Sequence, residues 1–125
     1  MKTELLLSYP RKVEFGKRYP VIIDLEHKPG EWKYEQEHFS LPCILSSHHL
    51  VTKSENNRLT IYRQASSEPA RFIVWARHPG ITVIRLTLLS EGGVPIHCQD
   101  LTGIQVEEHV QVSDPMDRFQ GRTNS

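Results

Sequence analysis

Seven histidines and two cysteines are the residues of this 125-residue chain that could bind a metal ion or act as nucleophiles. The set with the most suggestive spacing is Cys43, His48, His49, His97 and Cys98. Structural zinc requires four convergent ligands. Neighbouring residues on an extended strand point to opposite faces, so neither His48 and His49 nor His97 and Cys98 can converge from regular strands. We therefore predict no metal site and no cofactor, with surface histidines and buried cysteines.

A nucleophilic role for Cys98 would require a histidine within hydrogen-bond reach and an activating environment. The adjacent His97 points away on a strand, and no other histidine has a spacing that demands proximity. The Gly92-Gly93 pair precedes another strand rather than a phosphate-binding helix, and the chain lacks CxxC and HExxH motifs. We therefore predict that the protein is not an enzyme, with Cys98 a core residue of the last hairpin.

Charge and composition exclude several classes of protein. Fifteen basic residues balance fifteen acidic ones, so no global field attracts nucleic acid or an anionic membrane. The apolar run in residues 1–10 (MKTELLLSYP) is shorter than the about 7–15 residues of a secretory signal, and no run approaches the ~20 residues that span a bilayer. Two cysteines are too few for a disulfide scaffold. We expect a single cytoplasmic domain with no nucleic-acid or membrane partner.

The elements that must position these residues show a period of two, which is typical of β-strands. The expected strands are Lys12–Phe15, Tyr19–Glu26, Phe39–Leu45, Leu59–Tyr62, Arg71–Arg77, Ile81–Leu89, Val94–Cys98 and part of Leu101–Val112. No stretch shows helical periodicity. The pattern predicts an all-β, immunoglobulin-like antiparallel β-sandwich of about seven to nine short strands. We assign residues 1–112 to this domain and residues 113–125 (SDPMDRFQGRTNS), where the period ends, to a polar tail.

The stretch from Arg71 to Leu89 carries apolar residues on both faces of two strands around His78-Pro79-Gly80. One face has a core pattern, formed by Phe72, Val74, Ala76, Thr82, Ile84, Leu86 and Leu88. If the connection is a tight hairpin, these residues lie on one side of one sheet. If the two strands belong to different sheets, both sets still point into one core.

The opposite face of this stretch mixes apolar and basic side chains, and Trp and Arg are enriched at binding hot spots. We expect it to bind a partner protein through Arg71, Ile73, Trp75, Val83 and Arg85. The competing interpretation is ordinary packing of arginine stems over a half-exposed tryptophan.

Two further segments are candidates for contact with a partner. Trp32 and Tyr34 lie in an acidic loop, which is typical of an interface anchor with a charged rim. The alternative is that Trp32 caps one end of the sandwich. The Val94-Pro95 strand could form a sheet edge that accepts an added strand.

Three segments together resemble small immunoglobulin-like accessory domains of bacterial conflict and signalling proteins. They are YPRKVEFGKRYPVIIDLE, EWKYEQEHFSLPCIL and ARFIVWARHPGITVIRLTLLSEGGVPI, and the resemblance covers residues 4–112. Such modules accompany signal-transducing NTPase, caspase-like or trypsin-like protease domains. The resemblance carries over no catalytic residue. It implies an adaptor subunit that docks on a larger effector, a protease or a signalling NTPase, in antiviral defence or stress signalling.

Other functions stay open from the sequence. One is a small metal- or ligand-binding β-sandwich, and another is a protease substrate or inhibitor recognised through the tail after Ser113. Self-association is open as well.

Overall fold

A computed structural model describes residues 3–27, 35–64 and 67–107. These residues form ten strands and no helix. The strands are β1 (Thr3–Ser8), β2 (Lys12–Glu14), β3 (Arg18–His27), β4 (His38–Ser46), β5 (Leu50–Asn56), β6 (Arg58–Tyr62), β7 (Ser67–Glu68), β8 (Ala70–Ala76), β9 (Gly80–Leu89) and β10 (Pro95–Glu107).

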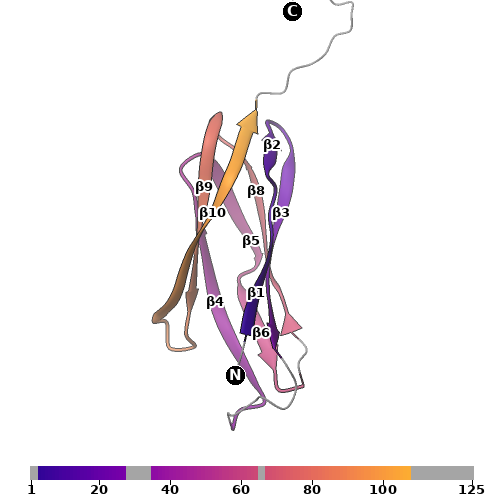
Figure 1. The fold of residues 1–125 in the computed structure, drawn as a ribbon, viewed down its shortest axis with the longest axis vertical. Helices are drawn as coiled ribbons and strands as arrows, with labels where there is room; N and C mark the ends of the chain where they lie inside the picture. The colour runs from indigo at the N-terminus through magenta and orange to yellow at the C-terminus, as the bar shows by residue number, and fades with distance from the viewer. Residues whose placement is uncertain (1–2, 28–34, 65–66, 108–125) are drawn as a thin grey trace, which may run out of the picture.

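The strands form two sheets packed face to face (Figure 1). The four-stranded sheet has the order β1-β3-β8-β5 and the six-stranded sheet the order β2-β10-β9-β4-β6-β7. The first order matches the A-B-E-D sheet of an immunoglobulin domain, and β10-β9-β4 matches its G-F-C sheet. All neighbouring strands are antiparallel except β2 and β10, which pair in parallel over three residues. The predicted all-β, immunoglobulin-like sandwich is confirmed.

The core lies between the two sheets and is built from the alternate residues that the period of two places inward. From the four-stranded sheet, Val21, Ile23, Phe72 and Val74 are buried. The six-stranded sheet supplies Val13, Cys43, Leu45, Leu59, Ile61, Ile84, Leu86, Leu88, Leu101, Ile104 and Val106. The predicted inner face of residues 71–89 is therefore part of this core, with Thr82 as its buried polar member.

The connection at His78-Pro79-Gly80 carries the chain from one sheet to the other, because β8 belongs to the four-stranded sheet and β9 to the six-stranded sheet. The backbone N–H groups of Arg77 and His78 both donate to the carbonyl of His49, at 2.7 and 3.2 Å. Gly80 has a φ of 117°, which a residue with a side chain rarely adopts. The sequence left open whether these two strands form a hairpin in one sheet or belong to different sheets, and the structure has them in different sheets.

Three described strands were not among the sequence expectations, namely β1, β5 and β7. β1 contains the leucine run of the N-terminal segment. β5 is an edge strand, and the five residues that follow Leu50 and Val51 in it are polar. The segments expected as two strands around Gln99-Asp100 are one continuous strand, β10. The pairing of β10 with β9 is regular except for two register shifts, one between Pro95 and His97 and one between Leu101 and Ile104.

The two sheets separate toward one end of the molecule. In Figure 1 the β9–β10 hairpin diverges from β1 and β3 at its lower left. The inward positions of β10 change there from the apolar Leu101 to the polar Gln99 and His97, which pair with the inward residues Leu86 and Leu88 of β9. Polar side chains on the inner face remain hydrated rather than pack in a core. This end of the sandwich is consequently open.

Candidate functional site

Trp75 lies on the outer face of the four-stranded sheet, where its ring is half-buried. The guanidinium carbon of Arg18, its register partner on β3, lies 4.1 Å from the centre of the Trp75 ring. On the other side Val51 of β5 is the register partner of Trp75. The tryptophan is thus held between two strands with a cation over its face, a contact that contributes about 0.5–1 kcal/mol at exposed sites.

The same outer face continues along β8 through Ile73 and Arg71. Ile73 is half-buried and pairs with Pro20 and Lys53, while Arg71 pairs with Ile22 and forms a 3.5 Å ion pair with Glu55. Opposed residues on neighbouring strands share a face. We call this surface the Trp75 face and define it by Arg18, Pro20, Ile22, Val51, Lys53, Arg71, Ile73 and Trp75.

The structure does not bring all the predicted partner-binding residues together. Val83 and Arg85 lie on the outer face of the six-stranded sheet, on the opposite side of the sandwich from Trp75. The reason is the sheet change at Gly80: two strands whose inner faces meet across a core have outer faces that point away from each other. The five residues of this stretch that are expected to bind a partner therefore do not lie on one surface.

Arg85 has a local partner on its own face. Its Nε donates to Oδ1 of Asp100 at 3.0 Å, and this hydrogen bond, more than the charge of Asp100, raises the pKa of the Arg85 guanidinium. A hollow of about 280 Å³ adjoins this ion pair and is lined by Ser46, Ser47, His48, Val83, Arg85 and Asp100. Trp32 and Tyr34, the remaining predicted contact residues, lie outside the described residues, as does the tail 113–125.

The two cysteines differ in environment. Cys43 is buried, as predicted, and burial raises the pKa of its thiol to about 11, although a hydrogen bond with the Leu59 backbone opposes part of that rise. Cys98 is exposed, so its expected place in the core is wrong. It pairs with Thr87, which points outward because Leu86 and Leu88 occupy the inner face of β9.

The histidines and cysteines that the structure describes do not assemble into a site. His97 turns toward the open end and contacts Gln99, with 3.0 Å between Nε2 and Oε1, while the neighbouring Cys98 faces outward. His49 meets His78 edge to face, with 6.1 Å between the ring centres. Within residues 3–27, 35–64 and 67–107, no group of three or more His, Cys, Asp or Glu side chains could hold a metal ion.

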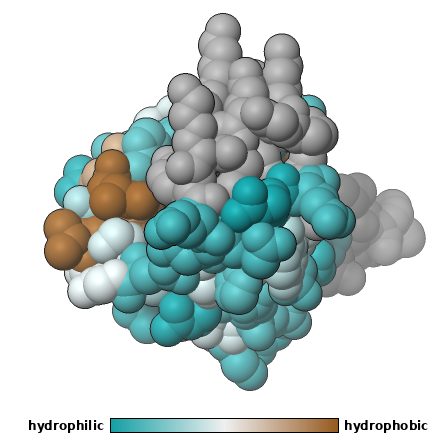
Figure 2. Space-filling view, turned by 90° about the horizontal axis from the view of Figure 1, so that it is seen from below, coloured by the Kyte–Doolittle hydropathy of each residue, from teal (hydrophilic) through white to brown (hydrophobic). Residues whose placement is uncertain are grey.

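A groove occupies the open end of the sandwich. Its volume is about 670 Å³, within the range of small-molecule binding sites. The lining is mainly apolar and comes from both sheets: Leu5, Leu25, Phe39, Leu41, Ile61, Leu88, Ser90, Glu91, Gly92, Ile96 and His97. Figure 2, viewed from this end, shows hydrophobic residues gathered on the side of the β9–β10 hairpin, whereas most of the remaining coloured surface is hydrophilic.

Sequence reasoning missed this groove and the role of Arg18. Most residues that line the groove occupy inward positions of their strands. In the sequence they therefore cannot be distinguished from residues of the core. The one usable signal was the run from Val94 to Gln99, in which apolar and polar residues do not alternate in the manner of the other strands. Arg18 could be placed beside Trp75 only once the register of β3 and β8 was known.

The fold and these surfaces define a two-sheet antiparallel β-sandwich with immunoglobulin-like strand order. No protein-family model matches the sequence, and no curated protein matches it. A cohesin module from a family 33 glycoside hydrolase of Clostridium perfringens ATCC13124 is a similar solved structure, with 11% identity over 86% of this chain and 98% of that chain and a TM-score of 0.46. A lipoprotein from Bacteroides thetaiotaomicron is similar with 11% identity, coverage of 97% and 91%, and a TM-score of 0.43. No helix in the described part of the chain is long and apolar enough to cross a membrane.

Proposed function

We propose that this protein is a non-enzymatic interaction module, an accessory or adaptor subunit that docks on a larger effector protein through the Trp75 face. The observation that carries the proposal is the half-buried Trp75 ring with the Arg18 guanidinium 4.1 Å above it, on a face that also presents Ile22, Val51 and Ile73. A large aromatic that is already held in place can be buried by a partner with little loss of conformational entropy.

The charges of the face indicate the kind of partner surface. Arg71 is paired with Glu55, whereas Arg18 and Lys53 have no carboxylate partner among the described residues. A partner that offers an apolar recess with an acidic rim would complement this arrangement, because opposite charges steer association and fix its orientation. The effector proposed from the sequence resemblance is a protease or a signalling NTPase in antiviral defence or stress signalling.

The test is affinity purification of the tagged full chain from its host, with mass spectrometry, followed by measurement of the Kd with the purified partner. Trp75→Ala should weaken binding by roughly 30-fold or more, since a hot-spot residue contributes at least about 2 kcal/mol. Arg85→Ala is the matched control, because Arg85 lies on the opposite outer face. A Trp75→Ala protein that melts normally and retains the partner with unchanged Kd contradicts the proposal.

A further inference from the structure

Among the strands that the structure describes, none covers the outer edge of β10 along its N-terminal half, Pro95–Leu101, which we call the free edge. β10 runs over 13 residues, but β2 pairs with it only at Gln105–Glu107. Along Pro95–Leu101 the strand pairs with β9 on one side, and no described strand pairs with it on the other. The N–H and C=O groups along such an edge are a template for the main chain of another strand.

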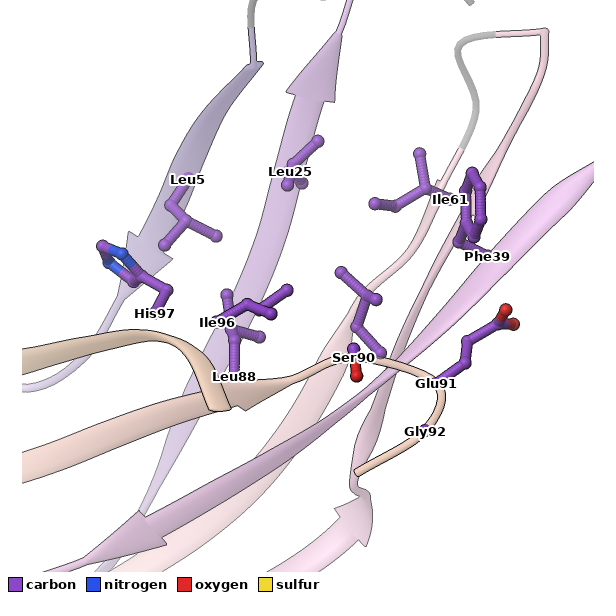
Figure 3. Close-up of a pocket in the computed structure, with 11 residues that line it drawn as sticks. Leu5, Leu25, Phe39, Ile61, Leu88, Ser90, Glu91, Gly92, Ile96 and His97 are labelled. Carbon is purple, nitrogen blue, oxygen red and sulfur yellow. The ribbon is translucent and has the colours of Figure 1, made fainter. Parts of the chain in front are cut away.

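The apolar groove lies beside this free edge. Leu5 of β1 and Leu25 of β3 face Phe39, Ile61 and Leu88 of the six-stranded sheet across it (Figure 3). At the edge itself Ile96 is 56% exposed, and Val94 before it is 62% exposed. A segment that lay along β10 would therefore find main-chain hydrogen-bonding groups on one side and an apolar recess for its inward side chains.

Glu91, in the turn between β9 and β10, is the one acidic side chain among the described residues that line the groove. Oε2 of Glu91 accepts a hydrogen bond from the Ser40 N–H at 3.1 Å. No Lys or Arg among the described residues pairs with it. The local charge therefore favours a ligand with a cationic group and opposes a fatty acid, whose own carboxylate would be repelled.

We propose that the groove binds an extended peptide segment of a partner protein. The segment adds a strand to the free edge of β10, places alternate apolar side chains between the sheets and brings a Lys or Arg to Glu91. A second copy that paired edge to edge would add its own β10, whose inward residues are His97 and Gln99. These polar side chains would leave the apolar recess unfilled. This site is separate from the Trp75 face and goes beyond the function proposed above.

The first experiment selects random nine-residue peptides displayed on phage against the purified full chain. We expect enrichment of peptides with apolar residues at alternate positions and a Lys or Arg near one end. Synthetic versions are then measured by fluorescence anisotropy. Ile96→Ser should weaken binding about tenfold or more, because it removes a branched apolar side chain from the contact. Ile44→Ser is the matched control, since Ile44 is a strand isoleucine 50% exposed on the outer face of the same sheet.

Two further measurements separate strand addition from simple hydrophobic binding. Methylation of the peptide amides that face β10 should abolish binding, whereas methylation of the alternate amides should leave it unchanged, because only the first set donates to the strand. Glu91→Gln should weaken a peptide with a basic residue about two- to fivefold and leave an otherwise identical peptide without that residue unaffected.

Each contrary result has a definite meaning. The proposal is wrong if no peptide is enriched, if Ile96→Ser and Ile44→Ser have equal effects, or if amide methylation has no positional effect. Displacement of the peptide by dodecanoate at a comparable Kd would establish a lipid-binding groove instead. Dimerisation blocked by Ile96→Ser would establish a second copy as the occupant. Trp75→Ala should not change peptide affinity, so failure here and failure of the Trp75 face are independent.

Discussion

The buried thiol of Cys43 should make the stability of the fold depend on pH in the alkaline range. Cys43 is 3% exposed on β4, where it is the register partner of Leu88. Burial, which deprives a thiolate of its hydration, raises the pKa of this thiol from 9.0 to about 11, and a hydrogen bond with the Leu59 backbone offsets part of the rise. The folded protein therefore holds the Cys43 proton more tightly than the unfolded chain does.

The sign and size of the effect follow from this difference in pKa. Below pH 9 the thiol is neutral in both states and its contribution to stability is fully present. As the pH rises toward 11, the unfolded chain releases the proton first, so unfolding becomes more favourable. One pKa unit corresponds to about 1.4 kcal/mol, so the loss should be about 1.4 kcal/mol at pH 10 and roughly 3 kcal/mol well above pH 11.

The assay is urea unfolding of the wild type and of Cys43→Ala at pH 8 and at pH 10 under reducing conditions. Titrations of tyrosines and lysines are common to both proteins and cancel in the comparison. The advantage of the wild type over Cys43→Ala should shrink by about 1.4 kcal/mol between the two pH values. Cys98→Ala removes an exposed thiol, so between pH 8 and pH 10 this variant should lose as much free energy of unfolding as the wild type does. If Cys43→Ala and the wild type lose equal amounts, the inferred burial of the thiol is wrong.

Two predictions concern the stability of the fold, one for a core side chain and one for a glycine in β10. Ile84→Ala, at a site with no exposed surface, should lower the free energy of unfolding by about 2–5 kcal/mol, whereas Leu6→Ala, 47% exposed on β1, should cost less than about 1 kcal/mol in the same urea titration. Gly103→Ala should lower the free energy of unfolding by about 1–2 kcal/mol, because Gly103 has a φ of 75° at the register shift in β10. Gly92 does not have a left-handed φ, so Gly92→Ala should change the free energy of unfolding by less than about 0.5 kcal/mol. Equal melting temperatures for the two glycine variants would show that the irregular backbone of β10 is not needed.

The inner faces of the strands could be predicted from the sequence because burial and period coincide there. In β8 and β9 the inward positions alternate with outward ones and most of them are apolar and buried, so Phe72, Val74, Ile84 and Leu86 needed no tertiary information. β1 was missed because its three consecutive leucines do not alternate; Leu6 points outward while Leu5 and Leu7 pack against the core. β5 was missed because an edge strand with polar residues on both faces has no apolar period.

What the sequence determined about this protein is its class, an all-β sandwich, and most of the residues that face its core. Tertiary structure alone decided which outer residues share a surface. The same alternation fits a hairpin in one sheet and two strands in facing sheets, because both arrangements bury the same residues. Only the hydrogen-bond partners of β8 and β9 placed Trp75 and Arg85 on opposite sides, and only the divergence of the β9–β10 hairpin opened the groove beside Ile96.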